Sequence, residues 1–121
     1  MQKKYILALD SGTVKNRAVI FDKNGELVSY AEKKISVDVP CEDWIEQDAD
    51  EIWSTQLWTA REALRLADIG HQEIAGVAVT NQRETSLVWN RHTGRPVYPA
   101  ISWQSRQTEG ICEKLKKMGL Q

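Results

Sequence analysis

The chain has 121 residues, enough for one domain with a hydrophobic core of its own. Its 41% hydrophobic and 27% charged residues are ordinary for a folded globular protein, which excludes the collagen-like, disordered and membrane classes. The formal net charge of −1 offers no basic surface to nucleic acid, and no apolar run reaches the roughly 18 residues of a membrane span. The charge and the short apolar runs therefore predict a cytoplasmic protein without nucleic-acid or membrane partners. Cys41 and Cys112 fit no metal-binding or disulfide pattern, so we expect both thiols to be reduced.

Three short strands are predicted at the start of the chain. Residues 5–9 form a continuous apolar run that ends in the polar turn 10–13, and residues 17–21 form a returning strand. Asn24-Gly25 is typical of a hairpin turn, after which residues 27–37 offer a third, more polar strand. The pattern predicts an antiparallel three-stranded meander.

A loop over residues 40–47 and a long helix are predicted next. Asp48 can cap this helix, with Glu51 at the capping-box position, and Gly70 is expected to stop it. Apolar residues recur along it at spacings of three and four, which predicts that one stripe packs across the sheet. The members of this stripe are Trp53, Leu57, Ala60, Leu64 and Ala67.

The second half of the chain adds further strands and one more helix. A buried strand-like run is predicted at 74–79, a further strand at 86–89 and an extended segment at 97–103, with a turn at 90–96 between the last two. Residues 108–118 have helical composition and are followed by Gly119 as a stop signal; Ile111, Leu115 and Met118 share one side. Three strands, a helix and a further strand predict an α/β fold of the ribonuclease H-like kind.

The polar turn at residues 10–13 is the first candidate functional feature. A glycine allows backbone amides to approach phosphate oxygens, the Thr13 hydroxyl adds a donor, and Asp10 can hold Mg²⁺ through water. Arg17 can add a charge-assisted contact. Asp, Ser and Gly also favour ordinary hairpin turns, so these residues alone leave a purely structural turn as the favoured alternative.

Five stretches spread along the chain carry recognisable motifs. They are residues 4–13, which include the polar turn, and residues 43–48, 80–85, 93–96 and 101–106. In this order and spacing they resemble the FGGY carbohydrate kinase family over the whole chain, and Thr80-Asn81-Gln82-Arg83-Glu84-Thr85 is the most specific of them.

The resemblance implies a fold of the actin/hexokinase/Hsp70 superfamily, with ATP and a sugar or polyol bound in a cleft between two lobes. Residues 1–121 would be the N-terminal portion of the N-terminal domain, an incomplete lobe without the C-terminal domain. The resemblance implies that Arg83 and Glu84 bind acceptor hydroxyls and that Trp103 packs against the acceptor's carbon backbone, roles that suit their donors, acceptors and ring. On the nucleotide side it implies Mg²⁺ held through water at Asp10 and phosphate contacts at Gly12, Thr13, Val14, Lys15 and Arg17.

Two departures from the family pattern stand out. Val14-Lys15-Asn16 replaces the usual Thr-Ser-Ser, so hydroxyls near the phosphates are lost. Lys15 either replaces them as a point charge or is simply solvated. Ser105 and Gln107 stand where the family usually has cysteine and arginine, which bears on the identity of the acceptor.

The leading hypothesis is an ATP- and Mg²⁺-dependent kinase that phosphorylates glycerol to glycerol 3-phosphate, with another polyol or a ketose such as xylulose as the alternative acceptor. The family's general base and adenosine-binding residues would lie beyond Gln121, so no catalytic residue is expected here and the chain alone is expected to be inactive. A non-catalytic remnant or binding module is a second hypothesis. A ribonuclease H-like nuclease is disfavoured, because it needs several converging carboxylates.

Two further expectations concern packing and assembly. Four tryptophans are assigned to packing: Trp44, Trp53, Trp58 and Trp89. An incomplete lobe would expose an apolar face, so homo-oligomerisation, as a dimer or a domain swap, is an expected outcome.

Overall fold

The computed structural model describes residues 2–120, which form two compact units. The first unit takes in the residues up to Ser36 together with Ala49–Arg83. The second takes in Val37–Asp48 and the residues from Glu84 onward.

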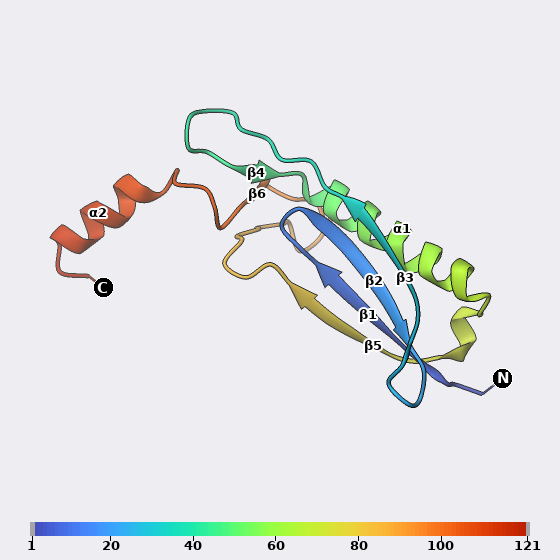
Figure 1. Ribbon diagram of the computed structural model, residues 1–121. Coiled ribbons are helices and arrows are strands. Elements are labelled where there is room, and N and C mark those ends of the chain that lie inside the picture. Colours follow the sequence, from blue (N-terminus) through green and yellow to red (C-terminus); the bar gives the residue numbers. More distant parts are fainter. Residues whose placement is uncertain (1, 121) are drawn as a thin grey trace. The chain divides into compact units, whose positions relative to one another are not determined.

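The first unit is built on a four-stranded sheet with the order β3-β2-β1-β5 (Figure 1). Its strands are β1 (Tyr5–Ser11), β2 (Lys15–Phe21), β3 (Leu27–Lys34) and β5 (Ile74–Asn81). The first three pair antiparallel in sequence, and β5 lies parallel to β1 on the side away from β2. The predicted meander and the α/β fold are both confirmed.

The long helix α1 (Ala49–Ala67) packs on one face of β1, β2 and β3 (Figure 1). The buried core between them is made largely of small side chains, namely Leu7, Ala18, Ile20, Ala31, Ala60 and Ala63. The predicted stripe is wrong at Trp53, which is 63% exposed, while the polar residues Thr55, Gln56 and Thr59 of the same helix are buried. The helix is therefore rotated relative to the stripe that the sequence predicts.

Hydrogen bonds between the sheet and α1 explain this rotation. The Asn16 amide, fully buried, donates to the Ile52 carbonyl at 2.8 Å and to Thr55 Oγ1 at 2.7 Å. Gln56 Nε2 donates to the carbonyl of Arg17 at 3.0 Å. Because buried polar groups are costly unless they are hydrogen-bonded, these contacts outweigh the preference for burying a tryptophan there.

The connection from α1 to β5 differs in detail from the prediction. The helix ends at Ala67, and Asp68 takes the left-handed conformation with φ of 54° that commonly closes a helix. Gly70 instead precedes the short 3₁₀ helix η1 (His71–Glu73), where its N–H donates to the Glu73 carboxylate at 3.0 Å. The expected stop at Gly70 is therefore displaced to Asp68.

Strand β5 is found where predicted, but its expected burial is wrong. Val77 is 57% exposed and Val79 is 73% exposed. The reason is position, because β5 is an edge of the described sheet. An apolar run alone does not distinguish an edge strand from a central one.

The second unit holds a smaller sheet and a helix. Its elements are β4 (Glu46–Gln47), which pairs antiparallel with β6 (Ala100–Ile101), and α2 (Glu109–Lys117). The helix and its stop are confirmed, since Gly119 has a φ of 78° and its N–H donates to the Lys116 carbonyl.

Three predicted elements of the second unit are corrected. The expected loop at 40–47 contains β4, the strand at 86–89 is reduced to single bridges at Ser86 and Trp89, and the extended run at 97–103 is reduced to β6. Pro96 and Pro99 have no N–H to donate to a ladder, which limits how far regular pairing extends in the last of these runs.

The tryptophans assigned to packing are all exposed to a considerable degree. The exposed fractions are 36% for Trp44, 63% for Trp53, 42% for Trp58 and 58% for Trp89. Trp58 has a polar neighbour instead, because the Lys33 ammonium lies 4.9 Å from its ring centroid. Within the residues that the structure describes, no helix combines the length and the apolar character needed to cross a bilayer.

The buried amide of Asn16 gives the first prediction. In Asn16→Ala, two hydrogen bonds are lost and the partners on α1 are left in a buried interface, so the free energy of unfolding should fall by roughly 1–3 kcal/mol. The matched control is Asn24→Ala in the exposed β2–β3 turn, which should change it by less than about 0.5 kcal/mol. Urea unfolding followed by circular dichroism measures both, and equal stability of the two variants would contradict the assigned role of Asn16.

Candidate functional site

The carboxyl ends of β1 and β5 lie side by side in the first unit. Ser11 pairs with Asn81, and the backbone N–H of Gln82 donates to the Ser11 carbonyl at 2.7 Å. The turn after β1 and the Gln82-Arg83 segment after β5 therefore start from the same edge of the sheet. In α/β sheets, the carboxyl ends of parallel strands are the usual place for a ligand site.

A row of polar side chains crosses the sheet just before this edge. Asp10 on β1 pairs with Arg17 on β2 and with Thr80 on β5. Because side chains alternate along a strand and Asn16 and Ala18 face α1, Arg17 and its partners in the row face away from the helix. Sequence analysis missed Thr80 as a member, since its pairing partner is far away in the chain.

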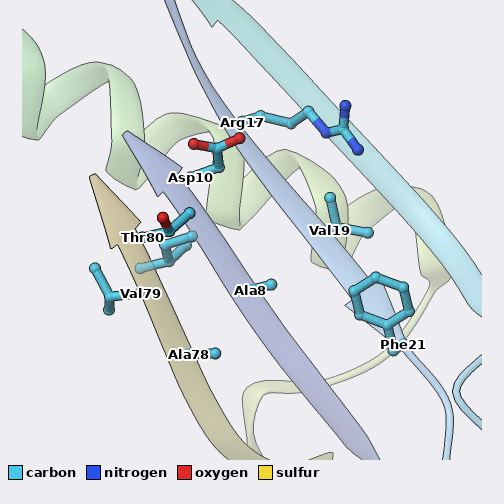
Figure 2. Close-up of a pocket in the computed structure, with 9 residues that line it drawn as sticks. Ala8, Asp10, Arg17, Val19, Phe21, Ala78, Val79 and Thr80 are labelled. Atoms are coloured by element: carbon cyan, nitrogen blue, oxygen red, sulfur yellow. The ribbon is translucent and has the colours of Figure 1, made fainter. Parts of the chain in front are cut away.

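This row closes one end of a hollow on the sheet face that α1 does not cover (Figure 2). Its volume is about 260 Å³. The rest of the lining is apolar and comes from three strands: Ala8, Leu9, Val19, Phe21, Ala78 and Val79. Figure 2 shows the polar side chains of Asp10, Arg17 and Thr80 grouped near one end of the strands and the apolar side chains further along them. The charged chemistry of this hollow is thus confined to the end nearest the β1–β2 turn.

The β1–β2 turn depends on Gly12. Its N–H donates to the Lys15 carbonyl at 3.1 Å, which closes the turn over Thr13 and Val14. A Cβ at position 12 would stand 2.6 Å from that carbonyl oxygen, closer than carbon and oxygen can approach. Glycine is therefore required for a steric reason, and its own N–H is used within the turn.

Lys15 and Arg17 extend from β2 on the same face. The Lys15 ammonium lies 2.8 Å from the Glu32 carboxylate of β3, and the Arg17 guanidinium carbon lies 5.8 Å from the Tyr30 ring centroid. The hydrogen bond from Lys15 lowers the pKa of Glu32, with smaller contributions from the charges of Lys15 and Arg17. Lys15 thus has a carboxylate partner and is not simply solvated.

The residues that depart from the family pattern, at positions 14–16, lie in different environments. The side chain of Asn16 is bound to α1, so this position faces the helix and not the phosphate turn. Val14 has its side chain 64% exposed, and its carbonyl accepts the N–H of Ile35 at 2.9 Å. Of the three positions at which a hydroxyl side chain is replaced, only Val14 lies in the turn itself, because β2 begins at Lys15.

Asp10 is the carboxylate expected to hold Mg²⁺. Among residues 2–120 there is no group of three or more His, Cys, Asp or Glu side chains that could hold a metal ion. Mg²⁺ at nucleotide sites needs only one or two carboxylates, because water and phosphate oxygens complete its octahedron. A single carboxylate beside a candidate phosphate turn fits that ion.

In the second unit, a strip of backbone hydrogen bonds joins the residues after Glu84 to those before Trp103. Ser86 and Ile101 exchange hydrogen bonds of 3.0 and 2.9 Å, and the Trp103 N–H donates to Thr85 Oγ1 at 3.2 Å. Glu84 has a φ of 64°, a strained value for a residue with a side chain, and such strain is concentrated at functional sites. The Trp103 side chain is 51% exposed and so remains accessible to a ligand.

One polar pair of this unit was missed by sequence analysis. The Tyr98 hydroxyl donates to Glu46 Oε2 at 2.5 Å, and Glu46 is only 5% exposed. The hydrogen bond to Glu46 is the main cause of a raised pKa of Tyr98, and burial and the Glu46 charge add to it. The two residues are 52 positions apart, so no local spacing could have linked them.

Comparisons with known proteins identify the family of the chain. Residues 5–121 match the N-terminal domain of the FGGY family of carbohydrate kinases. A glycerol kinase of Oceanobacillus iheyensis is 50% identical over 119 residues, which is 98% of this chain and 24% of that protein. The chain thus spans about a quarter of the length of this curated relative.

Solved structures show the same fold at lower identity. The ligand-bound xylulose kinase from Lactobacillus acidophilus has a TM-score of 0.86 at 21% identity, and Plasmodium falciparum glycerol kinase with ADP has 0.83 at 24% identity. Each covers 96% of this chain, which covers 23% of theirs. The match over residues 5–121 shows that the chain belongs to the FGGY family of carbohydrate kinases.

Proposed function

We propose that this chain supplies phosphate and acceptor contacts to an ATP- and Mg²⁺-dependent kinase, with glycerol as the acceptor and glycerol 3-phosphate as the product. The observation that carries the proposal is the shared sheet edge, where the β1–β2 turn and the Gln82-Arg83 segment both begin. The 50% identity to a glycerol kinase favours glycerol over larger acceptors. A kinase that consumes ATP in this way would work in the cytoplasm.

On the nucleotide side, the β1–β2 turn and the polar row would both contact the phosphates and their Mg²⁺. Backbone groups of Gly12, Thr13 and Val14 would lie along the phosphates, and Arg17 would neutralise charge on them. Lys15 would exchange its Glu32 carboxylate for a phosphate oxygen, since an exposed ion pair is worth little and is easily replaced. Mg²⁺ held through water by Asp10 would supply charge stabilisation to the transferring phosphoryl group.

On the acceptor side, Arg83 and Glu84 offer complementary groups. The guanidinium is a donor only and the carboxylate an acceptor only, so neighbouring hydroxyls of a polyol can satisfy both. Trp103 would cover the carbon backbone of the acceptor with its exposed ring. These contacts orient one primary hydroxyl, which is the main contribution that a protein makes to phosphoryl transfer.

The transfer itself joins the acceptor oxygen to the γ-phosphorus as the bond to the ADP oxygen breaks, and the hydroxyl proton leaves to a base. None of the residues assigned above has that role. We therefore propose that residues 1–121 bind and orient but do not turn over by themselves. A binding module without catalysis is the alternative, and it predicts ligand affinity without phosphorylation in any longer protein.

A chimeric kinase tests the proposed activity. Residues 1–121 replace the matching N-terminal quarter of the Oceanobacillus iheyensis glycerol kinase, and ADP release is followed with glycerol or xylulose as acceptor. We expect glycerol-dependent turnover that is lost in Arg83→Ala, because the donors to the acceptor hydroxyls are removed. A folded chimera that binds Mg-ADP but phosphorylates neither acceptor, beside an active parent kinase, would contradict the proposal.

The steric requirement at Gly12 gives a second test in the same chimera. Gly12→Ala forces the Lys15 carbonyl out of its place and shifts the turn, so kcat/KM for ATP should fall by about 10- to 100-fold. Gly110→Ala is the matched control, because a Cβ there meets open space, and it should stay within about twofold. Equal kcat/KM for the two variants would show that the turn does not contribute to nucleotide binding.

A further inference from the structure

Glu46 lies in the middle of a hydrogen-bonded ladder in the second unit. On one side its backbone exchanges bonds of 2.8 and 2.9 Å with Asp38, and on the other it pairs with Ile101 of β6. Ile101 in turn exchanges hydrogen bonds with Ser86. Glu46 is thus separated by a single strand from the segment that carries Glu84.

The side chain of Glu46 ties this ladder to the residues that precede β6. Its carboxylate is almost fully buried and accepts the 2.5 Å bond from Tyr98, two residues before Ala100. A buried carboxylate is costly unless hydrogen bonds satisfy it, and bonds to charged groups are the strong ones. The pair therefore fixes where β6 starts relative to β4.

Fixing β6 also fixes the residues assigned to the acceptor. Beyond Ile101, the Ser102 N–H donates to the Ile45 carbonyl at 3.0 Å, and the Trp103 N–H donates to Thr85 Oγ1. The strained φ of Glu84 persists only where neighbouring contacts determine the conformation. Those contacts include the Ser86–Ile101 bridge, which depends on the placement of β6.

We propose that Tyr98 and Glu46 are positioning residues that hold Glu84 and Trp103 in place for acceptor binding. Neither is assigned a contact with the acceptor, and both act through β6 and the strip that it forms with Ser86. The inference rests on the proposed function in one respect, namely that Glu84 and Trp103 bind the acceptor. Its structural half concerns the second unit alone and is measured separately.

The structural half is tested in the 121-residue chain by amide hydrogen exchange. Tyr98→Phe removes only the hydroxyl, so we expect the Ile101 and Ser86 amides to exchange about tenfold faster, while amides of β1 are unchanged. Tyr5→Phe, which removes a hydroxyl from the other unit, is the matched control and should leave both amides as they are. Unchanged exchange in Tyr98→Phe would overturn the proposal.

The functional half is tested in the chimeric kinase by separating KM from kcat. Tyr98→Phe should raise KM for glycerol about tenfold, with kcat and KM for ATP nearly unchanged, because only acceptor placement is disturbed. Glu46→Gln keeps an oxygen that accepts the hydrogen bond from Tyr98, so its KM for glycerol should stay close to that of the unchanged chimera. Glu46→Leu has no such oxygen and should raise KM for glycerol as Tyr98→Phe does. If Glu46→Leu does not fold, the values of KM for glycerol in Tyr98→Phe and Glu46→Gln still test the positioning role.

Two kinds of result in the chimeric kinase would count against these proposals. A fall in kcat without a change in KM, or equal KM for Tyr98→Phe and the Tyr5→Phe control, would overturn the positioning role. An inactive parent chimera would count against the proposed kinase function instead, and the exchange measurement would then decide the structural claim by itself.

Discussion

The two-sided pairing of β1 is the constraint on which the rest of the first unit depends. One neighbour, β2, is local and antiparallel, whereas the other, β5, is parallel and is reached only through α1. This pairing aligns Asp10, Arg17 and Thr80 across three strands, although Thr80 is seventy positions from Asp10 in the pairing register. A slip of β1 by one residue would turn Asp10 toward α1 and remove it from the row, so the register of β1 is itself a condition for the site.

The same alternation separates the structural from the functional positions of β2. Asn16 faces α1 and is hydrogen-bonded to it, while Lys15 and Arg17 face the opposite side and meet Glu32 and Tyr30. The two replacements that lie in β2, at Lys15 and Asn16, are therefore of different kinds. Asn16 is part of the helix–sheet interface, and Lys15 adds a charge on the face proposed for phosphate.

Contiguous patterns predicted the fold well, and contacts between distant residues account for what they missed. The meander, both helices and β5 follow from apolar runs, turn residues and helix stops that lie within a few positions of one another. The same patterns did not predict which side chains are buried. The exposure of Val79 depends on the strand order, and the exposure of Trp53 depends on the polar contacts of Asn16 with α1. For the candidate site, the motifs around residues 10–17 and 80–84 were recognisable in the sequence, whereas Thr80 as a partner of Asp10 and the Tyr98–Glu46 bond depend on pairing that no local signal encodes.

The proposed kinase function requires that the β1–β2 turn contacts the nucleotide phosphates and that Arg83 and Glu84 bind the acceptor. A crystal structure of the chimeric kinase with Mg-ADP and glycerol tests it most directly. We expect the β-phosphate to lie against the backbone of Gly12–Val14 with Arg17 nearby. We also expect a magnesium-bound water on Asp10 and glycerol hydroxyls hydrogen-bonded to Arg83 and Glu84. Phosphates or glycerol bound away from these residues would contradict it.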